Sequence, residues 1–449
     1  MTDTPIIYQI YVDAFARGSS DRAPGRQRGG DLEGATERLD YIASLGADAI
    51  WLTPIFSSPS DHGYNITDYF HVDSRLAPDG DDPDELFGRF VDRAHELGLG
   101  ILLDLPLNHV GHGYDLDQVE TATPDEPPRL RPARTRQERG WQRDLKYLDH
   151  DHPPTRRWLF DVARYWIERY RVDGYRYDYV HGIGNEFWAD LYTELERLRP
   201  GLFVVGEYWE DIGTPEENAR DIASRFDIEG GRCFDTLFDF PFQAAAVESL
   251  AAGTPTEVVK ILDLCERSYP RAACAMLDNH DTARIGDWLH GDPVRQALAL
   301  RLLASRTGPI SVLYGTETGL VAGGPPRRAV DESSRIPMNW DETESDLVAT
   351  TRALFEARKA YPVITEGSTE ARGAIGPLFV ERKRGADGSE VLTVLNFSSE
   401  ACATGVDMSQ VFAGSYDGAA ICGGDALRVE NGVLESEMPA FGGGLYVMQ

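Results

Sequence analysis

Short runs of β-branched and aromatic residues alternate along most of this chain with longer stretches in which apolar residues recur every three or four positions. The short runs are typical of buried strands, and the longer stretches are typical of amphipathic helices. The predicted strands are Ile6–Val12, Ala47–Thr53, Leu99–Leu105, Val172–Asp178, Leu202–Glu207, Phe234–Phe240, Arg271–Leu277 and Pro309–Tyr314. The predicted helices include Leu32–Leu45, Pro83–Leu97, Pro154–Tyr170, Asn185–Leu198, Thr256–Arg267 and Pro293–Ser305. This alternation predicts an α/β fold, a (β/α)₈ TIM barrel with its active site at the carboxyl ends of the strands.

Two segments depart from the alternation. The segment His109–His152 is rich in proline, arginine and acidic residues, and it interrupts the third connection from strand to helix. Such a long connection is usually functional, so we predict a small inserted subdomain over the barrel mouth. From about Ile364 the pattern changes to short strands with glycine-rich turns, which predicts a C-terminal all-β sandwich. The expected domains are the barrel (1–108 and 153–362), the inserted subdomain (109–152) and the sandwich (363–449).

The charge of the chain limits its partners. Lysine and arginine total 44 against 74 acidic residues, for a net charge of −30. Such a surface repels nucleic-acid phosphates and anionic lipids, so we expect neither nucleic acid nor a membrane as a partner. Two interpretations of the acidic excess stay open. It is either a solvated surface that keeps the protein soluble, or an adaptation to high salt, in which counterions screen the self-repulsion.

The sequence also bears on the compartment. No apolar run approaches the roughly 20 residues that a membrane-spanning helix needs. The N-terminus lacks the basic region and apolar stretch of a secretory signal. The cysteines are odd in number and lack metal-ligand spacing, which is typical of reduced thiols. We therefore expect a cytoplasmic protein, present as a monomer or homodimer.

Polar clusters follow four of the predicted strands, at Asp104–His109, Asp173–Asp178, Gly206–Trp209 and Leu277–Asp281. A lone aspartate in such a position is more often a helix N-cap than a catalytic group. In a parallel barrel, however, the carboxyl ends of all the strands meet at one mouth. Four clusters in that position indicate an active site.

These clusters resemble the conserved blocks of the α-amylase family of glycoside hydrolases. Further segments carry the resemblance at Gly46–Ile55, His62–Tyr69, Leu313–Glu317 and Arg335–Trp340, and together they cover nearly the whole chain. The segments Gly29–Gly34 and His62–Asn65 look most like the intracellular members that degrade maltodextrins and cyclomaltodextrins. The resemblance implies an oligosaccharide or polysaccharide as the substrate.

The resemblance assigns roles to three acids. Cleavage of an acetal requires one carboxylic acid to protonate the departing oxygen and one carboxylate to attack the anomeric carbon, about 5 to 5.5 Å apart in retaining enzymes. By the resemblance, Asp178 is the nucleophile and Glu207 the general acid/base, whose pKa burial and nearby negative charge should raise. Asp281 is expected to bind sugar hydroxyls and to favour a distorted ring.

Other expected site residues bind substrate or orient the acids. Arg176, two residues before Asp178 on the same strand face, is expected to keep that carboxylate ionised. By the resemblance, His109 and His280 hydrogen-bond the sugar and Tyr64 stacks beneath it. Trp141 and Trp209 are candidates for outer sugar platforms, with core packing as the open alternative. By the resemblance, His181 borders the leaving-group side, where it takes part in acceptor binding or is a structural residue.

A calcium site is not expected. Family members with calcium between the barrel and the insertion use an asparagine corresponding to Asn108 and an aspartate where this chain has Tyr147. A phenol is a poor ligand for a hard cation. We therefore predict no metal at Asn108 and no other cofactor, and we interpret the loop Asp13–Asp21 as an ordinary turn instead of an ion site.

Three functions are compatible with these residues. The leading interpretation is a retaining hydrolase of α-1,4-linked glucans that favours soluble malto-oligosaccharides. A transglycosylase or a glucosyl isomerase would pass the same covalent intermediate to a sugar instead of water. A catalytically inactive barrel that serves as a binding subunit is the third, and the presence of Asp178, Glu207 and Asp281 argues against it.

Overall fold

Eight parallel strands form the central sheet of the computed structural model, which describes residues 2–18, 29–119, 126–209, 214–327, 332–422 and 424–448. Their spatial order is β13-β10-β9-β5-β2-β1-β15-β14. A parallel bridge between Phe238 and Cys274 joins the two ends of this order and closes the barrel. Every strand lies within a predicted one: β1 (Ile6–Ile10), β2 (Ala49–Leu52), β5 (Gly100–Leu105), β9 (Gly174–Tyr177), β10 (Phe203–Gly206), β13 (Thr236–Leu237), β14 (Ala275–Met276) and β15 (Ile310–Leu313). The predicted barrel is confirmed.

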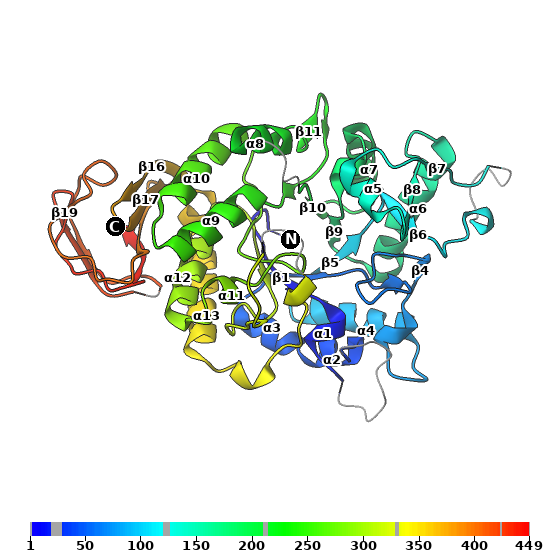
Figure 1. Cartoon of the computed structure of the whole chain (residues 1–449), viewed down its shortest axis with the longest axis horizontal. Coiled ribbons are helices and arrows are strands. Elements are labelled where there is room, and N and C mark those ends of the chain that lie inside the picture. Colours follow the sequence, from blue (N-terminus) through cyan, green and yellow to red (C-terminus); the bar gives the residue numbers. More distant parts are fainter. Residues whose placement is uncertain are drawn as a thin grey trace.

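Helices surround the barrel (Figure 1). Several begin with an aspartate cap, and Asp82 and Asp292 each precede a proline in the first turn, which is preorganised for a helix start. The helices around the strands are α2 (Leu32–Glu37), α3 (Leu39–Leu45), α4 (Pro83–Glu96), α6 (Pro153–Tyr170), α7 (Asn185–Leu198), α8 (Pro215–Ala223), α9 (Phe240–Ala252), α10 (Thr256–Ser268), α11 (Ile285–Trp288), α12 (Pro293–Ala304), α13 (Asp346–Ala360) and α14 (Pro362–Glu366). None of the helices in the described residues has the length and apolar character needed to cross a membrane.

Two predicted elements differ in the structure. The helix expected at Leu32–Leu45 is interrupted at Arg38, whose ψ of 2° is not helical, so α2 and α3 are separate. The sixth strand ends at Leu237, and Phe240 instead begins α9, which Asp239 caps by accepting a hydrogen bond from the Phe242 amide. Helix α9 was not predicted because its few polar residues, Gln243, Glu248 and Ser249, are spread around the helix, so it lacks the periodicity of an amphipathic helix.

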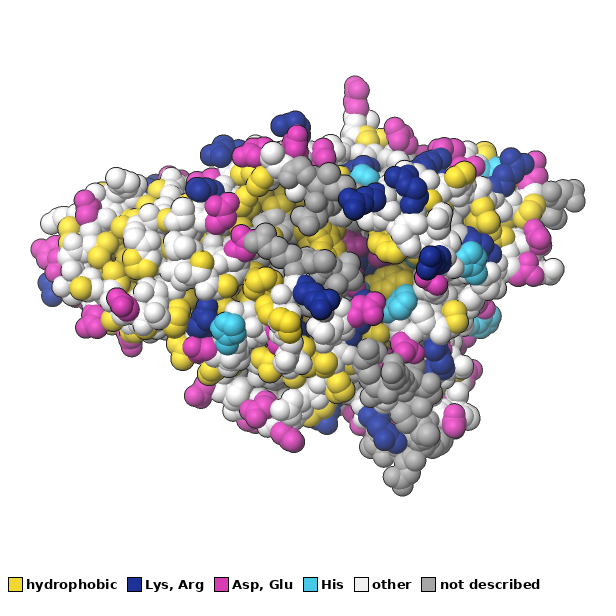
Figure 2. Space-filling model, viewed as in Figure 1, with side chains coloured by type: hydrophobic (Ala, Val, Ile, Leu, Met, Phe, Trp, Pro, Cys, Tyr) yellow, Lys and Arg dark blue, Asp and Glu magenta, His cyan; other side chains and the backbone are white. Residues whose placement is uncertain are grey.

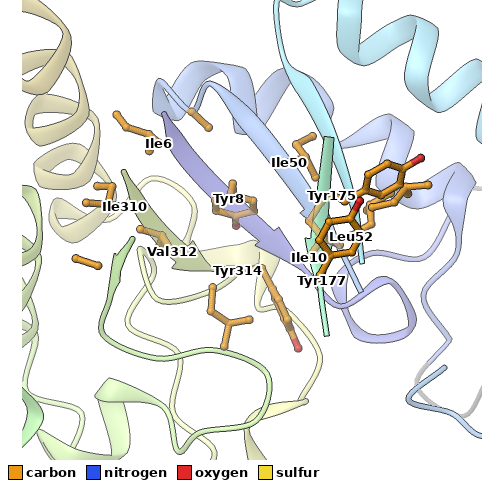
Figure 3. Close-up of a cluster of buried hydrophobic side chains, with 14 of the residues drawn as sticks. Ile6, Tyr8, Ile10, Ile50, Leu52, Tyr175, Tyr177, Ile310, Val312 and Tyr314 are labelled. Carbon is orange, nitrogen blue, oxygen red and sulfur yellow. The ribbon is translucent and has the colours of Figure 1, made fainter. Parts of the chain in front are cut away.

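The core has an inner and an outer layer because successive side chains of a strand point to opposite faces. Ile7 of β1 points into the barrel with Trp51 and Leu102. Its neighbours Ile6 and Tyr8 belong to the layer between the strands and the helices. Figure 3 shows part of this outer layer. Filling both layers fixes the strands, and with them the loops that leave their carboxyl ends.

The inserted segment and the C-terminal segment lie at opposite ends of the molecule (Figure 1). The insertion contains a three-stranded sheet, β6 (His109–Gly111), β8 (Leu145–Leu148) and β7 (Leu130–Arg131), and a short helix α5 (Arg136–Trp141). The C-terminal segment forms two four-stranded antiparallel sheets, as predicted. One sheet contains β16 (Ser368–Ile375), β17 (Leu378–Arg384), β18 (Glu390–Asn396) and β23 (Gly443–Met448); the other contains β19 (Val406–Asp407), β22 (Val433–Leu434), β21 (Leu427–Glu430) and β20 (Tyr416–Gly418).

The exact domain bounds stay a prediction, and helix α14 spans the predicted junction of barrel and sandwich at residues 362 and 363. The predicted turn Asp13–Asp21 is described only in part. Asp13 lies in helix α1 (Val12–Phe15) and accepts a hydrogen bond from the Gly29 amide. Residues 19–21 of that segment lie outside the described residues.

Candidate active site

A cavity of about 500 Å³ opens at the carboxyl ends of the barrel strands, between these ends and the inserted subdomain. Figure 2 shows a hollow near the middle of this face, with acidic and hydrophobic side chains in and around it. The cavity is lined by His62, Tyr64, Asn65, His109, Gln137, Trp141, Asp144, Leu145, Asp178, Tyr179, Glu207, Trp209, Asp281, Glu332 and Arg335. Seven of the predicted site residues are in this set, so the fold gathers side chains that lie far apart in the sequence.

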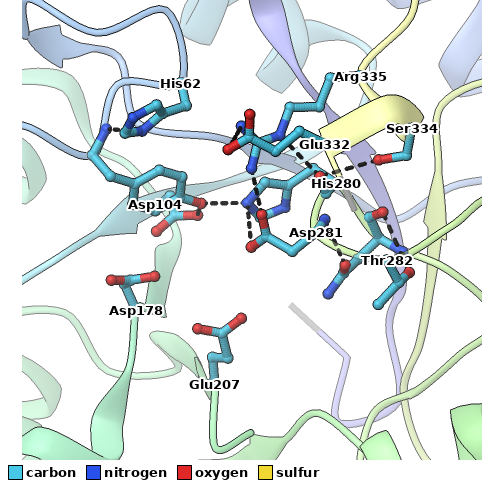
Figure 4. Close-up of polar contacts among 12 residues, drawn as sticks. His62, Asp104, Asp178, Glu207, His280, Asp281, Thr282, Glu332, Ser334 and Arg335 are labelled. Atoms are coloured by element: carbon cyan, nitrogen blue, oxygen red, sulfur yellow. Dashed lines mark hydrogen bonds and ion pairs between the residues drawn. The ribbon is translucent and has the colours of Figure 1, made fainter. Parts of the chain in front are cut away.

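Arg176 holds the two principal acids next to each other. Its side chain is fully buried, and its Nη1 lies 2.8 Å from Oδ1 of Asp178 while its Nη2 lies 2.6 Å from Oε1 of Glu207. Because both contacts come from one planar guanidinium, the two carboxyl groups face the same small volume (Figure 4). Arg176 also binds both oxygens of buried Asp104, at 2.7 and 2.9 Å.

The charges at the site favour a shared proton. Burial raises the pKa of Glu207 to about 7; the negative charges of Asp178 and Asp281 add to the rise, and Arg176 opposes it. Burial also raises the pKa of Asp178, again against Arg176. Two carboxylates that share one site cannot both ionise easily, so a proton on one favours the ionised form of the other. This is the pairing that an acid and a nucleophile require.

Asp281 is held by a second set of contacts. Nε2 of Gln9 donates to Nδ1 of His280 at 2.6 Å, so the ring carries its proton on Nε2, which lies 3.0 Å from Oδ2 of Asp281. Burial lowers the pKa of His280, although the contact with Asp281 opposes this. Arg335 contacts the other oxygen of Asp281 at 2.5 Å. Burial would raise the pKa of Asp281, but the contacts with His280 and Arg335 outweigh it and hold that pKa well below its usual range.

Tyr64 lies between Asp104, which Arg176 binds, and His280, which contacts Asp281. Its hydroxyl donates to Asp104 at 2.9 Å and contacts Nε2 of His280 at 2.6 Å. Its ring is nearly parallel to the imidazole of His280, with 5.6 Å between ring centroids. His109 approaches from the insertion, and its Nε2 contacts the Tyr64 carbonyl oxygen at 3.2 Å. Burial lowers the pKa of His109 to about 4, so this ring is neutral at pH 7.

The outer candidates differ in their placement. The Trp141 side chain is 38% exposed and lines the cavity instead of packing in the core. Trp209 also lines the cavity and stacks on Phe240, with 4.8 Å between ring centroids. His181 is not among the described residues that line the cavity. Its ring lies against those of Tyr208 and Tyr179, with 5.3 and 6.0 Å between centroids, and Tyr179 lines the cavity.

The surroundings of Asn108 do not fit a calcium ion. Nη2 of Arg131 donates to Oδ1 of Asn108 at 2.7 Å, so a guanidinium occupies the position in front of the oxygen that would bind the metal. The same nitrogen contacts Glu138 at 2.7 Å, and the hydroxyl of Tyr147 donates to the Glu138 carbonyl oxygen. Within the described ranges, no group of three or more His, Cys, Asp and Glu side chains has the arrangement of a metal site.

Several residues of the site were not predicted as site residues. Asp104 and Arg335 belong to segments that the sequence analysis singled out, so their proximity to the acids could have been suspected. Gln9 is a buried polar residue in an apolar strand, which is a weak signal of a polar contact. Tyr179 directly follows the predicted nucleophile, whereas nothing in the sequence pattern indicates Glu332. The place of Glu332 depends on which loops meet in space.

A closed eight-stranded barrel with a pair of buried carboxyl groups at the carboxyl ends of its strands has the arrangement that glycoside hydrolases use. Comparison with known families identifies which one. The family model for the α-amylase catalytic domain matches residues 9–129 and 137–367, so the chain belongs to the α-amylase family.

Similar proteins of known name support this family assignment. A cyclomaltodextrinase of Geobacillus thermopakistaniensis is 29% identical over 428 residues, which cover 88% of this chain and 69% of the relative. An intracellular maltogenic amylase of Bacillus subtilis is 27% identical over 403 residues, which cover 81% of this chain and 63% of the relative. This chain thus spans about two thirds of the length of both. The structure of an α-amylase from Geobacillus thermoleovorans with acarbose superposes with a TM-score of 0.82 at 25% identity, over 100% of this chain and 98% of the other.

Proposed function

We propose that this protein hydrolyses α-1,4-glucosidic bonds of malto-oligosaccharides or related α-glucans through a covalent glycosyl-enzyme intermediate. The observation that carries the proposal is the contact of Arg176 with both Asp178 and Glu207 at the wall of a sugar-sized cavity. Membership of the α-amylase family, and relatives named as a cyclomaltodextrinase and a maltogenic amylase, support it.

The reaction has two steps. In the first, an oxygen of Asp178 attacks the anomeric carbon, the glycosidic bond breaks, and Glu207 transfers its proton to the departing oxygen. The product is an ester between Asp178 and the sugar. In the second, Glu207 as a carboxylate takes a proton from water, the resulting hydroxide attacks the anomeric carbon, and the bond to Asp178 breaks. Glu207 ends protonated, ready for the next cycle.

Other residues bind the sugar whose anomeric carbon reacts. Asp281, ionised between His280 and Arg335, accepts hydrogen bonds from sugar hydroxyls and favours the positively charged transition state. Tyr64 presents its ring to the cavity, held in place through its hydroxyl. His109 lines the same cavity as a neutral hydrogen-bonding group. Trp209 and Trp141 are proposed to contact outer sugars.

Product analysis on maltotriose tests the function. A hydrolase gives only glucose and maltose, as separated by chromatography. A transferase or glucosyl isomerase also gives longer or rearranged sugars, because an acceptor sugar replaces water. A barrel that binds maltotriose without converting it would be a binding subunit, and this result would contradict the proposal.

The pH dependence should follow Glu207. The acid form of Glu207 is required in the first step, and its pKa is raised to about 7. We therefore expect kcat/KM on maltotriose to fall as the pH rises through about 7, and to fall again at low pH when Asp178 is protonated. Initial rates measured from about pH 4 to pH 9 at constant ionic strength check this. In the Glu207→Gln variant, residual cleavage of an activated glycosyl fluoride should lack the decline at high pH. A decline at the same pH in that variant would contradict the assignment.

The acidic surface is proposed to be an adaptation to salt. Acidic and basic side chains are interspersed over the face shown in Figure 2, and the net charge of −30 leaves the acidic ones in large excess. Counterions screen this repulsion, so we expect the free energy of unfolding to rise from dilute buffer to about 2 M KCl. Urea unfolding at several KCl concentrations measures it. Stability that stays level or falls would leave solubility as the role of the charge.

The remaining proposals concern metal, compartment and assembly. We propose that activity needs no calcium at Asn108, because Arg131 supplies the positive charge there; activity that survives EDTA would agree. A cytoplasmic location is supported by the name of the intracellular Bacillus subtilis relative. A monomer or a homodimer is proposed for the assembly, and light scattering during gel filtration distinguishes the two.

A further inference from the structure

Arg284 is a fully buried arginine in the connection that follows β14 and Asp281. It lies directly before helix α11. Within the described residues, its Nη1 donates to the carbonyl oxygen of Tyr314 at 2.7 Å, and its Nε donates to that of Ser334 at 2.9 Å. A guanidinium is planar and rigid, so it fixes the distance between two acceptors that it binds together. Arg284 therefore joins the end of β15 to the loop that contains Ser334.

The loop 332–336, which contains Ser334, reaches the substrate cavity. Arg335 lines the cavity; its Nη2 contacts Oδ1 of Asp281 at 2.5 Å, and its Nε donates to the carbonyl oxygen of His280 at 3.0 Å. The hydroxyl of Ser334 donates to the same carbonyl oxygen at 3.1 Å (Figure 4). The backbone of Ser334 thus directly precedes the residue that holds Asp281.

Tyr314 provides a second contact to the same loop. Its hydroxyl donates to the carbonyl oxygen of Ile336 at 2.6 Å, and the guanidinium of Arg284 lies over its ring, 4.7 Å from the centroid. Arg284 and Tyr314 therefore bind the carbonyl groups on both sides of Arg335. Because the backbone of Arg335 is held before and after it, its guanidinium is confined to the neighbourhood of Asp281.

We propose that Arg284 is a positioning residue, which keeps the guanidinium of Arg335 on Asp281 by holding the loop 332–336. The inference rests on the proposed function, in which Asp281 binds the sugar and favours the transition state. Within the described residues, Arg284 is not part of the cavity lining, so it acts through Arg335 and not by contact with the substrate. Misplacement of a catalytic group by about 1 Å lowers a rate by up to about 100-fold.

Replacement of Arg284 with methionine tests this role. Methionine binds neither carbonyl group, so Arg335 should move away from Asp281. We expect kcat on maltotriose to fall about tenfold while KM changes less than about threefold, because a positioning defect acts mainly in the transition state. Arg284→Lys keeps the charge, but its single nitrogen cannot occupy both donor positions of the guanidinium, and it should lose about threefold in kcat. This milder variant decides the question if Arg284→Met does not fold.

Arg358→Met is the matched control. Arg358 is also buried, and it also donates to carbonyl oxygens, those of Ala304 and Arg306 at 2.8 and 2.6 Å. It does not belong to the described residues that line the cavity. Arg358→Met should therefore lower the stability against urea but keep kcat within about twofold. An equal fall of kcat in both methionine variants would show that Arg284 supports the barrel in general, and the inference would be wrong.

A double-variant cycle shows whether Arg284 acts through Arg335. If it does, Arg284→Met combined with Arg335→Met should match the kcat of Arg335→Met alone within about twofold. A further tenfold loss in the double variant would overturn the inference. If the original protein does not cleave maltotriose, the proposed function itself fails. Crystal structures of Arg284→Lys and the original protein then decide the inference: we expect Arg335 to lie farther from Asp281 in the variant, and an unchanged contact would contradict it.

Discussion

Replacing Asp178 with asparagine is expected to lower kcat on maltotriose by about 10⁴-fold or more, the range found when a covalent nucleophile is removed. The amide of asparagine cannot attack the anomeric carbon, so no glycosyl-enzyme forms. Its similar size should keep the hydrogen bond from Arg176 and the shape of the cavity. Steady-state kinetics of the purified variant measure the loss, and calorimetry with maltotriose shows whether binding persists.

A matched control separates loss of the nucleophile from loss of a charge. Asp151 lies two residues before helix α6, with a side chain that is 84% exposed and a contact of 3.4 Å to Arg134. Asp151→Asn should keep nearly the full activity and the same thermal midpoint. If folded Asp178→Asn retained more than about 1% of kcat, the nucleophile would have to be sought elsewhere.

Arg131→Met should destabilise the protein by about 3 to 5 kcal/mol, because it leaves the buried Glu138 carboxylate without its partner. Both side chains are almost fully buried, and they meet at 2.7 Å. Although burial opposes it, hydrogen bonds from Arg131 and the Arg134 amide lower the pKa of Glu138 from 4.5 to about 2. This contribution to stability is therefore present above about pH 4.5 and is lost as the pH falls towards 2. Urea unfolding at pH 7 measures the difference.

Two other variants test whether the loss of stability comes from the buried pair of Arg131 and Glu138. Arg134→Met removes a guanidinium whose side chain is 54% exposed, and it should cost less than about 1 kcal/mol. The double variant Arg131→Met with Glu138→Leu removes both charges, so it should be more stable than Arg131→Met alone. A double variant less stable than the single one would show that the Glu138 carboxylate stabilises the protein through its other donors, Asn108 and the Arg134 amide, even without Arg131.

The sequence predicted the barrel because alternation of strand and helix is a local signal that survives folding. It failed where the local signal is missing or ambiguous. Helix α9 is mostly apolar and its few polar residues do not gather on one face, so its first residue was assigned to the preceding strand. The break at Arg38 leaves the apolar spacing of the two helices intact and therefore produces no change in pattern.

The acids of the site were predictable for a related reason. Asp178, Glu207 and Asp281 each follow a strand, and closure of the barrel brings strand ends together whatever their separation in sequence. Contacts between individual side chains could not be predicted in this way. Gln9 and His280 are 271 positions apart, and no rule of periodicity connects them. Arg131 likewise reaches Asn108 across a loop whose path the sequence does not define.

The strands that lead to the catalytic acids differ in how far they are paired with their neighbours, and the pairing is short where the barrel closes between β13 and β14. Strand β9, which leads to Asp178, pairs with a neighbour on each side over four positions. Strand β14, which leads to Asp281, pairs with β15 over two positions. On its other side, the bridge between Phe238 and Cys274 connects the described residues of the two barrel ends. We expect amide hydrogens around β14 to exchange sooner than those of β9. Asp178 would then lie on the more rigid side of the barrel, while the side that carries Asp281 adjusts to the bound sugar.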